Sequence, residues 1–204
     1  MRAVLLPEDS LPATLKLNPD LHLSDDQFFE FCMANPEHSF ERTSHGEIVI
    51  VPPVGLESND QESEIIEQLR RWAKRDGRGR GFGATAEFIL PTGAAYSPDA
   101  AWVSNKQLSR LTKEQRRKFP PVCPEFVIEV MSPTDRLKSS MQKMEEWVRA
   151  GVELGWLIRP DRRTVYVYRA GQKGAEERTG TTKLRGEGPV AGFVLDLKDI
   201  WAGL

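Results

Sequence analysis

The segment Phe126–Met131 is apolar except for one acidic residue, Glu129. A run of this kind predicts a strand that is buried on both faces of a sheet. A buried carboxylate costs several kcal/mol unless a cation or hydrogen-bond donors compensate its charge. The chain must therefore fold so that a partner for Glu129 lies against this strand.

A second acidic residue, Asp99, lies in the strand-like segment Tyr96–Val103. Strand residues two apart share a face, so Asp99 lies on the same side as Ala101. If this strand is a neighbour of the strand with Glu129, the two carboxylates converge. Paired carboxylates with a backbone carbonyl and waters bind Mg²⁺, and such an ion activates water against a phosphodiester. The alternative is two buried acids satisfied by backbone amides, Arg or Lys, and the strand pattern leaves both open.

The order of the predicted elements defines the fold class. Hydrophobic periodicity and turn residues predict helices at about 24–35, 59–74, 105–118 and 132–150, strands at about 40–43, 47–51, 82–90, 96–103, 126–131, 154–158, 164–168 and 193–197, and a loop at 171–188. The step from the strand at 126–131 to the strand at 154–158 is long enough for a crossover between parallel strands. We therefore predict an α/β domain with a mixed β-sheet flanked by helices.

The length of 204 residues fits one domain. We expect an irregular arm over residues 1–22 and a single domain over residues 23–204. Two isolated cysteines, Cys32 and Cys123, indicate reduced core residues and a cytoplasmic protein rather than a disulfide framework. Neither a signal segment nor a membrane-spanning run is apparent, so no membrane partner is expected.

Positive charge is concentrated in two places, although the net charge is -2. The first cluster comprises Arg70, Arg71, Lys74, Arg75, Arg78 and Arg80, and the second comprises Lys113, Arg116, Arg117 and Lys118. Cations at a helix C-terminus are favoured by the helix dipole in any case, which would make these clusters solvated helix ends. The alternative is a grip on a phosphate backbone without sequence readout.

Four further residues could join the acid pair. Glu64, in the helix predicted at 59–74, is either a third acid of the site or a solvated helix residue. Lys143 lies in the helix after the strand of Glu129, and its ammonium could reach back over the strand end. Lys138 borders the apolar stripe of the same helix on its other side, and helix geometry alone does not choose between the two lysines. Glu41 is another candidate near the same sheet.

Several short motifs occur along the chain in an order that matches a known family pattern. The ordered set Ser97-Pro98-Asp99, Glu125–Glu129, Ser132-Pro133, Lys143 and Gly155–Ile158 resembles the Uma family of restriction endonucleases, in the PD-(D/E)XK nuclease-like superfamily. The resemblance extends from about residue 20 to Trp201. No single tripeptide in it is specific, but the ordered set is.

The resemblance implies a restriction-endonuclease-like fold with Asp99 and Glu129 as metal ligands and Glu64 as their helper. The superfamily usually has a lysine two residues after the second acid, where this chain has Met131. The resemblance therefore implies a lysine relocated to the following helix, with Lys143 preferred.

These observations together predict an enzyme: an endonuclease that hydrolyses DNA phosphodiester bonds with Mg²⁺ (or Mn²⁺). Asp99, Glu129, Lys143 and Glu64 are its expected catalytic residues. Homodimerisation is expected because cutting both strands of a duplex suits two-fold symmetry. The rival interpretation, from another class, is a catalytically inactive nuclease-fold module for binding or assembly. A hydrolase of another phosphodiester is a third.

Overall fold

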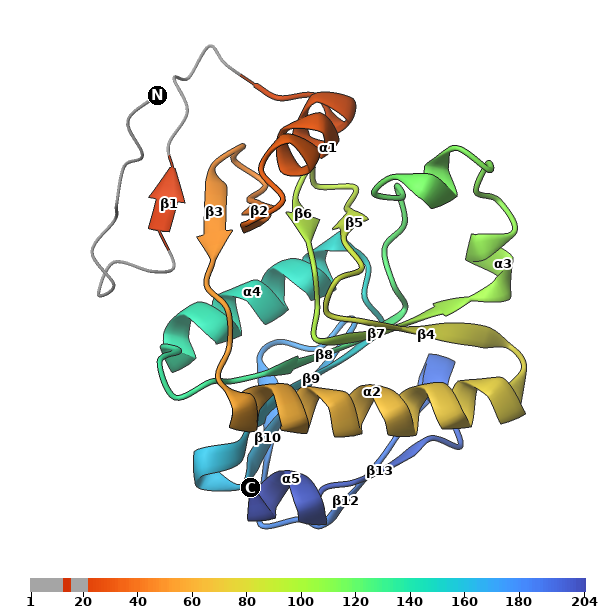
Figure 1. The fold of residues 1–204 in the computed structure, drawn as a ribbon. Coiled ribbons are helices and arrows are strands. Elements are labelled where there is room, and N and C mark those ends of the chain that lie inside the picture. Colours follow the sequence, from red (N-terminus) through yellow and green to blue (C-terminus); the bar gives the residue numbers. More distant parts are fainter. Residues whose placement is uncertain (1–12, 16–21) are drawn as a thin grey trace.

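A computed structural model of the chain describes residues 13–15 and 22–204, and its centre is a six-stranded mixed sheet (Figure 1). In spatial order the strands are β11 (Ala175–Thr179), β10 (Thr164–Arg169), β9 (Leu154–Arg159), β8 (Phe126–Val130), β7 (Ala100–Ser104) and β4 (Gly79–Gly83). Among the described strands of this sheet, β8 and β9 alone are parallel, and helix α4 (Leu137–Ala150) connects them. The predicted mixed sheet and its crossover are confirmed.

Helix α2 (Leu56–Asp76) covers one face of this sheet. Its apolar residues Ile65, Leu69 and Ala73 recur at helical spacing and are buried in one cluster with Trp102 and Phe126 of the sheet. Full burial of an Ile or Leu side chain contributes about 1.5–3 kcal/mol. The amphipathic stripe of α2 therefore fixes this helix along β4, β7 and β8.

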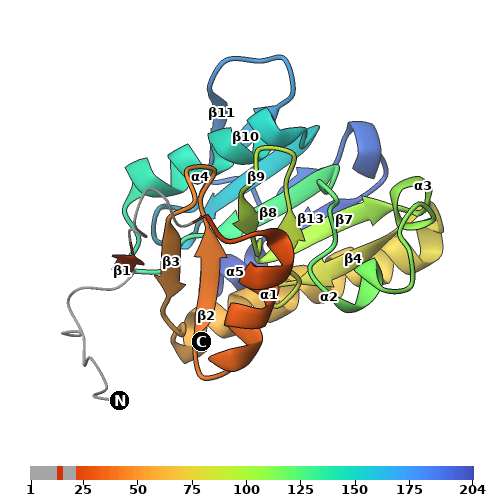
Figure 2. The same ribbon diagram turned by 90° about the horizontal axis from the view of Figure 1, so that it is seen from above.

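Helix α4 covers the opposite face, where Met144 and Trp147 are fully buried in a cluster that includes Val127. Figure 2 shows α4 and α2 on the two sides of the sheet. Val127 and Glu129 are two residues apart in β8 and so share a face. The carboxylate of Glu129 therefore projects toward α4 rather than toward α2.

A second sheet of five short strands lies beside the first (Figure 2). Its order is β1 (Ala13–Leu15), β3 (Ile48–Val51), β2 (Ser39–Arg42), β6 (Ala95–Tyr96) and β5 (Phe88–Ile89). Helix α1 (Asp25–Ala34) packs onto it through Phe28 and Cys32. The predicted hairpin is present as β2 and β3. The arm expected over residues 1–22 contains β1, which pairs with β3, and residues 1–12 and 16–21 lie outside the described part.

The segment expected as a loop contains strands, and the segment expected as one long strand is divided. The loop expected at 171–188 contains β11 and β12 (Lys183–Arg185), and β12 pairs with β13 (Val194–Asp196). Strands β12 and β13 and helix α5 (Lys198–Ala202) contribute Leu184, Leu195 and Ile200 to the cluster under α2. The strand expected at 82–90 is divided between β4 and β5 by a turn in which the amide of Ala86 donates to Gly83.

Two predicted helix boundaries are wrong. The helix expected at 105–118 is reduced to α3 (Asn105–Leu108) and a 3-10 turn at Gln115–Arg117. Reciprocal bonds between Thr112 and Gln115 hold the intervening turn. Helix α4 begins at Leu137 rather than near Ser132, because Asp135 closes a separate turn by accepting from the amide of Ser132 at 2.7 Å.

None of the helices in residues 13–15 and 22–204 combines the length and the apolar character that crossing a bilayer demands.

Close packing of β4 against β7 leads to a stability prediction. A Cβ added at Gly79 would lie 2.4 Å from the ring of Trp102 and 2.5 Å from the carbonyl oxygen of Val103. We expect Gly79→Ala to lower the free energy of unfolding by about 2–3 kcal/mol, the usual cost of overpacking. Gly83→Ala on the same strand is the matched control, because its Cβ would meet only Ile66 at 3.4 Å. Urea unfolding measures both, and equal stability of the two variants would contradict the predicted packing.

Candidate active site

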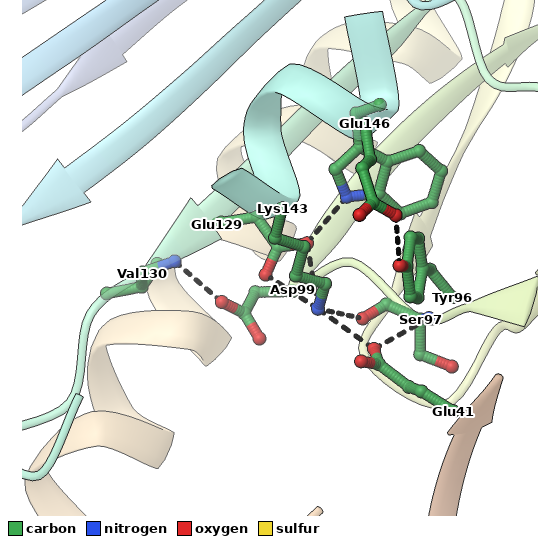
Figure 3. A network of polar contacts seen from close by, with 9 residues as sticks. Glu41, Tyr96, Ser97, Asp99, Glu129, Val130, Lys143 and Glu146 are labelled. Atoms are coloured by element: carbon green, nitrogen blue, oxygen red, sulfur yellow. Dashed lines mark hydrogen bonds and ion pairs between the residues drawn. The ribbon is translucent and has the colours of Figure 1, made fainter. Parts of the chain in front are cut away.

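The register of β7 and β8 places the two predicted acids side by side. Ala100 lies opposite Ile128 in this antiparallel pair. Asp99 is one residue before Ala100 and Glu129 is one residue after Ile128, so they form the next opposed pair, with side chains on one face. The Oδ2 of Asp99 accepts a hydrogen bond of 2.6 Å from the amide of Val130 (Figure 3). The expected convergence of the acids is present.

Helix α4 supplies the groups that compensate Glu129. The indole of Trp147 donates to Oε1 of Glu129 at 2.8 Å. The ammonium of Lys143 lies 3.1 Å from Oε1 and 3.2 Å from Oε2 of the same carboxylate. The Glu129 side chain is only 12% exposed, so both contacts act in a poorly solvated place. Lys143 and Trp147 are one helical turn apart, which lets one face of α4 provide both donors.

The same ammonium reaches the second sheet. Lys143 Nζ lies 2.8 Å from Oε1 of Glu41, on β2, and 3.5 Å from the carbonyl oxygen of Ser97. Oε1 of Glu41 also accepts from the amide of Ser97 at 3.2 Å. Figure 3 shows the Lys143 amine between the carboxylates of Glu41 and Glu129. One cation thereby joins the two sheets at the site.

Aromatic contacts hold α4 in position over these acids. The hydroxyl of Tyr96 is hydrogen-bonded to Glu146 of α4. The Tyr96 and Trp147 rings meet edge to face at 5.6 Å, and Lys143 Nζ lies 5.6 Å from the centre of the Tyr96 ring. The direction of the Lys143 side chain is therefore set by packing as well as by charge.

Burial dominates the electrostatics of the acid pair. Desolvation raises the pKa of Asp99 and of Glu129 above the usual range, and the charge of Lys143 opposes this rise. Burial by itself lowers the pKa of Lys143, but the charges of Glu129 and Glu41 outweigh it and raise the pKa. The lysine is therefore held as a cation, whereas Asp99 and Glu129 bind protons more readily than free carboxyls do, because one ammonium does not offset their burial.

Two acids of α2 flank its buried stripe on opposite sides, and the structure brings Glu62 to the site rather than Glu64. Burial first, then the charges of Glu129 and Asp135, raise the pKa of Glu62. Glu62 in turn contributes to the raised pKa of Asp99. Glu64 instead accepts from Gln68 at 2.8 Å, and Gln68 bonds the backbone of Asp196 in β13. Only Glu64 was singled out from the sequence. Both acids border the buried stripe, so helical spacing alone does not indicate which of them reaches the site.

The structure also separates the two candidate lysines. Lys143 is 25% exposed and contacts two carboxylates. Lys138, five residues earlier on α4, is exposed and makes no hydrogen bond or ion pair within the described ranges. Met131 is buried in the cluster under α4, so the position where the superfamily usually has its lysine is part of the core here.

The two basic clusters are partly neutralised by neighbours. In the first, Arg71 pairs with Glu67 and Arg78 pairs with Asp76. Arg70, Lys74 and Arg80 have no ion pair with another described residue and line a cleft of about 530 Å³ along β4. In the second cluster, Lys118 pairs with Asp26 and Glu114, while Arg117 has no such partner within the described ranges. Only part of each cluster is therefore available to bind phosphate.

The donor set of the site suits a hard cation. Asp99 and Glu129 offer carboxylate oxygens, which Mg²⁺ and Mn²⁺ prefer as ligands. Within the part of the chain that is described, no group of three or more His, Cys, Asp or Glu residues is gathered closely enough to form a metal centre by itself. The pKa values of Asp99 and Glu129 stay raised in spite of Lys143, so the ammonium alone does not offset their burial, and this fits an added cation.

The fold and the paired acids with their lysine define a restriction-endonuclease-like α/β protein. The family model Uma2, described as "Putative restriction endonuclease", matches residues 25–198, so the chain belongs to this family. Among solved structures, the chain is similar to "a putative nuclease belonging to DUF820 from Anabaena variabilis". The identity is 23%, the match covers 81% of this chain and 91% of that chain, and the TM-score is 0.66, so the likeness concerns the fold alone.

A more distant likeness is to the cryo-EM structure of a DrdV–DNA complex, with 12% identity and a TM-score of 0.37. The match covers 56% of this chain and 9% of that chain, and a likeness at this level supports no conclusion about fold or function. No curated protein matches the chain.

A third buried acid, Glu87, was not singled out by sequence reasoning, although it directly precedes the apolar run Phe88–Leu90. It is 7% exposed, and its Oε1 has no hydrogen-bond partner among the described residues. Burial raises the pKa of Glu87 to about 8, and the charge of Glu41 adds to the rise while Arg42 and Lys143 oppose it. Glu87 therefore lies within the electrostatic field of the site.

The lysine contacts lead to a second stability prediction. Lys143→Met removes the cation shared by Glu41 and Glu129, and two partly buried carboxylates lose their partner. We expect the free energy of unfolding at pH 7 to fall by about 1–3 kcal/mol. Lys138→Met on the same helix is the control and should change it by less than about 0.5 kcal/mol. Equal losses in urea unfolding would contradict the bridging role.

Glu87 leads to a prediction about pH. A carboxyl whose pKa is raised on folding binds its proton more tightly in the folded state, so it stabilises less as pH rises from its ordinary value of 4.5 to about 8. Glu87→Gln has no such loss. We expect the variant to gain stability over the wild type across this window, by a few kcal/mol, since one pKa unit corresponds to about 1.4 kcal/mol.

Urea unfolding at pH 4.5, 6, 7 and 8 measures this difference. Glu30→Gln, on the exposed side of α1, is the control for removing a carboxyl. A stability difference between Glu87→Gln and the wild type that stays constant with pH would contradict the prediction.

Proposed function

We propose that this protein is a divalent-metal-dependent endonuclease that hydrolyses phosphodiester bonds of DNA. The observation that carries the proposal is the opposed pair Asp99 and Glu129 with the ammonium of Lys143 held 3.1 Å from Glu129. Membership of the restriction endonuclease family supports the same chemistry.

Asp99 and Glu129 are the proposed ligands of Mg²⁺ or Mn²⁺. Glu62 of α2 is the proposed third acid, in the helper role that the family resemblance implies for Glu64, because the charge of Glu62 acts on Asp99. When bound, the ion would polarise the scissile phosphate and lower the pKa of the attacking water.

Lys143 has the proposed role of orienting the water and stabilising negative charge that develops on the phosphate. Its two contacts with Glu41 and Glu129 restrict the ammonium before substrate binds. A preorganised cation in a poorly solvated place stabilises a developing charge more than one in bulk water does. Glu41 is then a positioning residue, because it acts through Lys143.

DNA is the proposed partner, and the cleft along β4 is its proposed contact. Arg70, Lys74 and Arg80 line this cleft without an ion pair to another described residue. Such cations bind phosphates and do not read base sequence. We further propose a homodimer, because two copies would cut both strands, and a cytoplasmic location, where free Cys32 and Cys123 stay reduced.

One observation favours the rival, an inactive nuclease-fold module for binding or assembly. The acids already have partners, since Val130 donates to Asp99 and both Trp147 and Lys143 contact Glu129. A purely structural network would look the same. Calorimetry with Mn²⁺ separates the two, because only the endonuclease requires metal binding that Asp99→Asn and Glu129→Gln abolish.

Plasmid nicking tests the proposed function directly. In Mg²⁺ or Mn²⁺ we expect the wild type to nick supercoiled plasmid and Glu129→Ala to lose at least about 100-fold in rate, because it lacks a metal ligand. Lys143→Ala should lose about 100-fold or more with little change in metal affinity. Lys138→Ala is the matched control on α4 and should nick like the wild type.

The variants also reveal whether the nicking comes from a contaminating nuclease or from another site. Nicking by Glu129→Ala at the wild-type rate would mean that the activity comes from elsewhere. Parallel reactions with single-stranded DNA and RNA address the third possibility, another phosphodiester substrate, and preferential cleavage of RNA would overturn the assignment to DNA.

A further inference from the structure

A pocket lined by none of the proposed catalytic residues lies between α1, β4 and residues 105–122. Its volume is about 860 Å³, within the range of about 300–1,000 Å³ that is usual for small-molecule sites. Four phenylalanines line it: Phe29, Phe82, Phe88 and Phe119. Three of them, Phe29, Phe82 and Phe119, are only partly buried, so their rings are accessible.

A polar group also lines this mostly apolar pocket. Glu87 is among its lining residues, is 93% buried, and has no hydrogen-bond partner for Oε1 in the described ranges. A buried polar atom without a partner costs about 1–3 kcal/mol. Burial raises the pKa of Glu87 to about 8, so near pH 7 the group is largely a neutral carboxylic acid. A neutral carboxyl offers one donor and one acceptor side by side.

Cations surround the mouth of the pocket. Arg80, Arg116, Arg117 and Lys118 are all lining residues. Arg80 and Arg117 make no ion pair with a described residue, whereas Lys118 pairs with Asp26 and Glu114. An aromatic interior with a hydrogen-bonding acid and a cationic rim complements a flat, polar-edged ring that carries a phosphate.

The pocket is continuous with the cleft proposed to bind DNA. Arg80, Phe82, Thr85, Ala86 and Asn105 line both. Gly83, at the end of β4, lies opposite Ala100, the residue after Asp99. A DNA strand that leaves the pocket along β4 therefore meets the cations of the cleft that have no ion pair with a described residue. The acid pair lies at the end of the neighbouring β-strand, β7.

We propose that this pocket binds one nucleotide of a DNA strand that has turned out of the base stack, with the base among the phenylalanine rings and the phosphates on the rim cations. The inference rests on the proposed action on DNA. Stacking of a base on aromatic rings tolerates any sequence. The donor and acceptor of Glu87 complement the edge of an unpaired base, as in sites that accept flipped nucleotides.

Binding to bulged DNA tests the proposal without requiring cleavage. Fluorescence anisotropy in EDTA compares a labelled duplex with one extrahelical nucleotide and the same duplex with an abasic bulge. We expect the wild type to bind the bulged base about 10-fold more tightly than the abasic bulge, the usual size of one stacking contact. Equal affinity for the two duplexes would overturn the proposal.

Variants assign the preference to the pocket. Phe82→Leu keeps an apolar side chain and should reduce the base preference, and Glu87→Ala should remove most of it. Glu87→Gln retains a donor and an acceptor and should keep the preference. Arg117→Ala should weaken binding of both duplexes alike, because it contacts phosphate. An unchanged preference in Phe82→Leu and in Glu87→Ala would overturn the assignment to this pocket.

Two further arms separate the alternatives. Deoxynucleoside monophosphates should compete only weakly, and tight binding of a monophosphate without preference for the bulged base would assign the pocket to free nucleotides instead. Plasmid nicking, measured in parallel, distinguishes failure of the pocket proposal from failure of the proposed endonuclease activity. Nicking with no base preference removes the pocket proposal alone, and a base preference without nicking removes the endonuclease alone.

Discussion

The contact on which the site depends is the ammonium of Lys143 between two carboxylates from different sheets. Glu41 is on β2 of the second sheet and Glu129 is on β8 of the central sheet, and each lies within 3.1 Å of Lys143 Nζ. An unpaired charge at either place would be costly, because both side chains are nearly buried. The ion pairs therefore couple the packing of the two sheets to the position of α4. Displacement of either sheet or of α4 would leave a buried carboxylate without its ammonium partner.

The excess of acid around this lysine is a constraint in its own right. Burial raises the pKa of Asp99, Glu62 and Glu129, and the charge of each acid raises the pKa of one of the others. The ammonium of Lys143 opposes the rise at Asp99 and at Glu129. A site built only for stability would replace such acids with apolar residues, which pack at lower cost. Met131, directly after β8 and two residues from Glu129, is an apolar side chain buried under α4, so this face of the sheet accommodates apolar residues. The retained acids favour a site that works with an added cation.

The sequence predicted what depends on short-range periodicity. Strand parity put Asp99 and Glu129 on one face, and the apolar run with its following helix predicted the parallel crossover. It singled out Glu64 and not Glu62, and helix geometry left Lys143 and Lys138 open, because each pair borders an apolar stripe and only tertiary packing selects one side. One helix end and one helix start were also wrong, because side-chain bonds such as that between Asp135 and the amide of Ser132 interrupt a helical pattern locally.

Charge is distributed unevenly over this molecule, so its net value of -2 conceals local groups of cations. The acids of the site are buried and compensated, so they contribute little field at a distance. The cations of β4 and its neighbours divide into those neutralised by nearby acids, such as Arg71 and Arg78, and those left without a partner among described residues, such as Arg70 and Arg80. Attraction of a polyanion depends on the second group, and salt screens it over about 8–10 Å. A chain of negative net charge therefore retains a local surface for phosphate along β4.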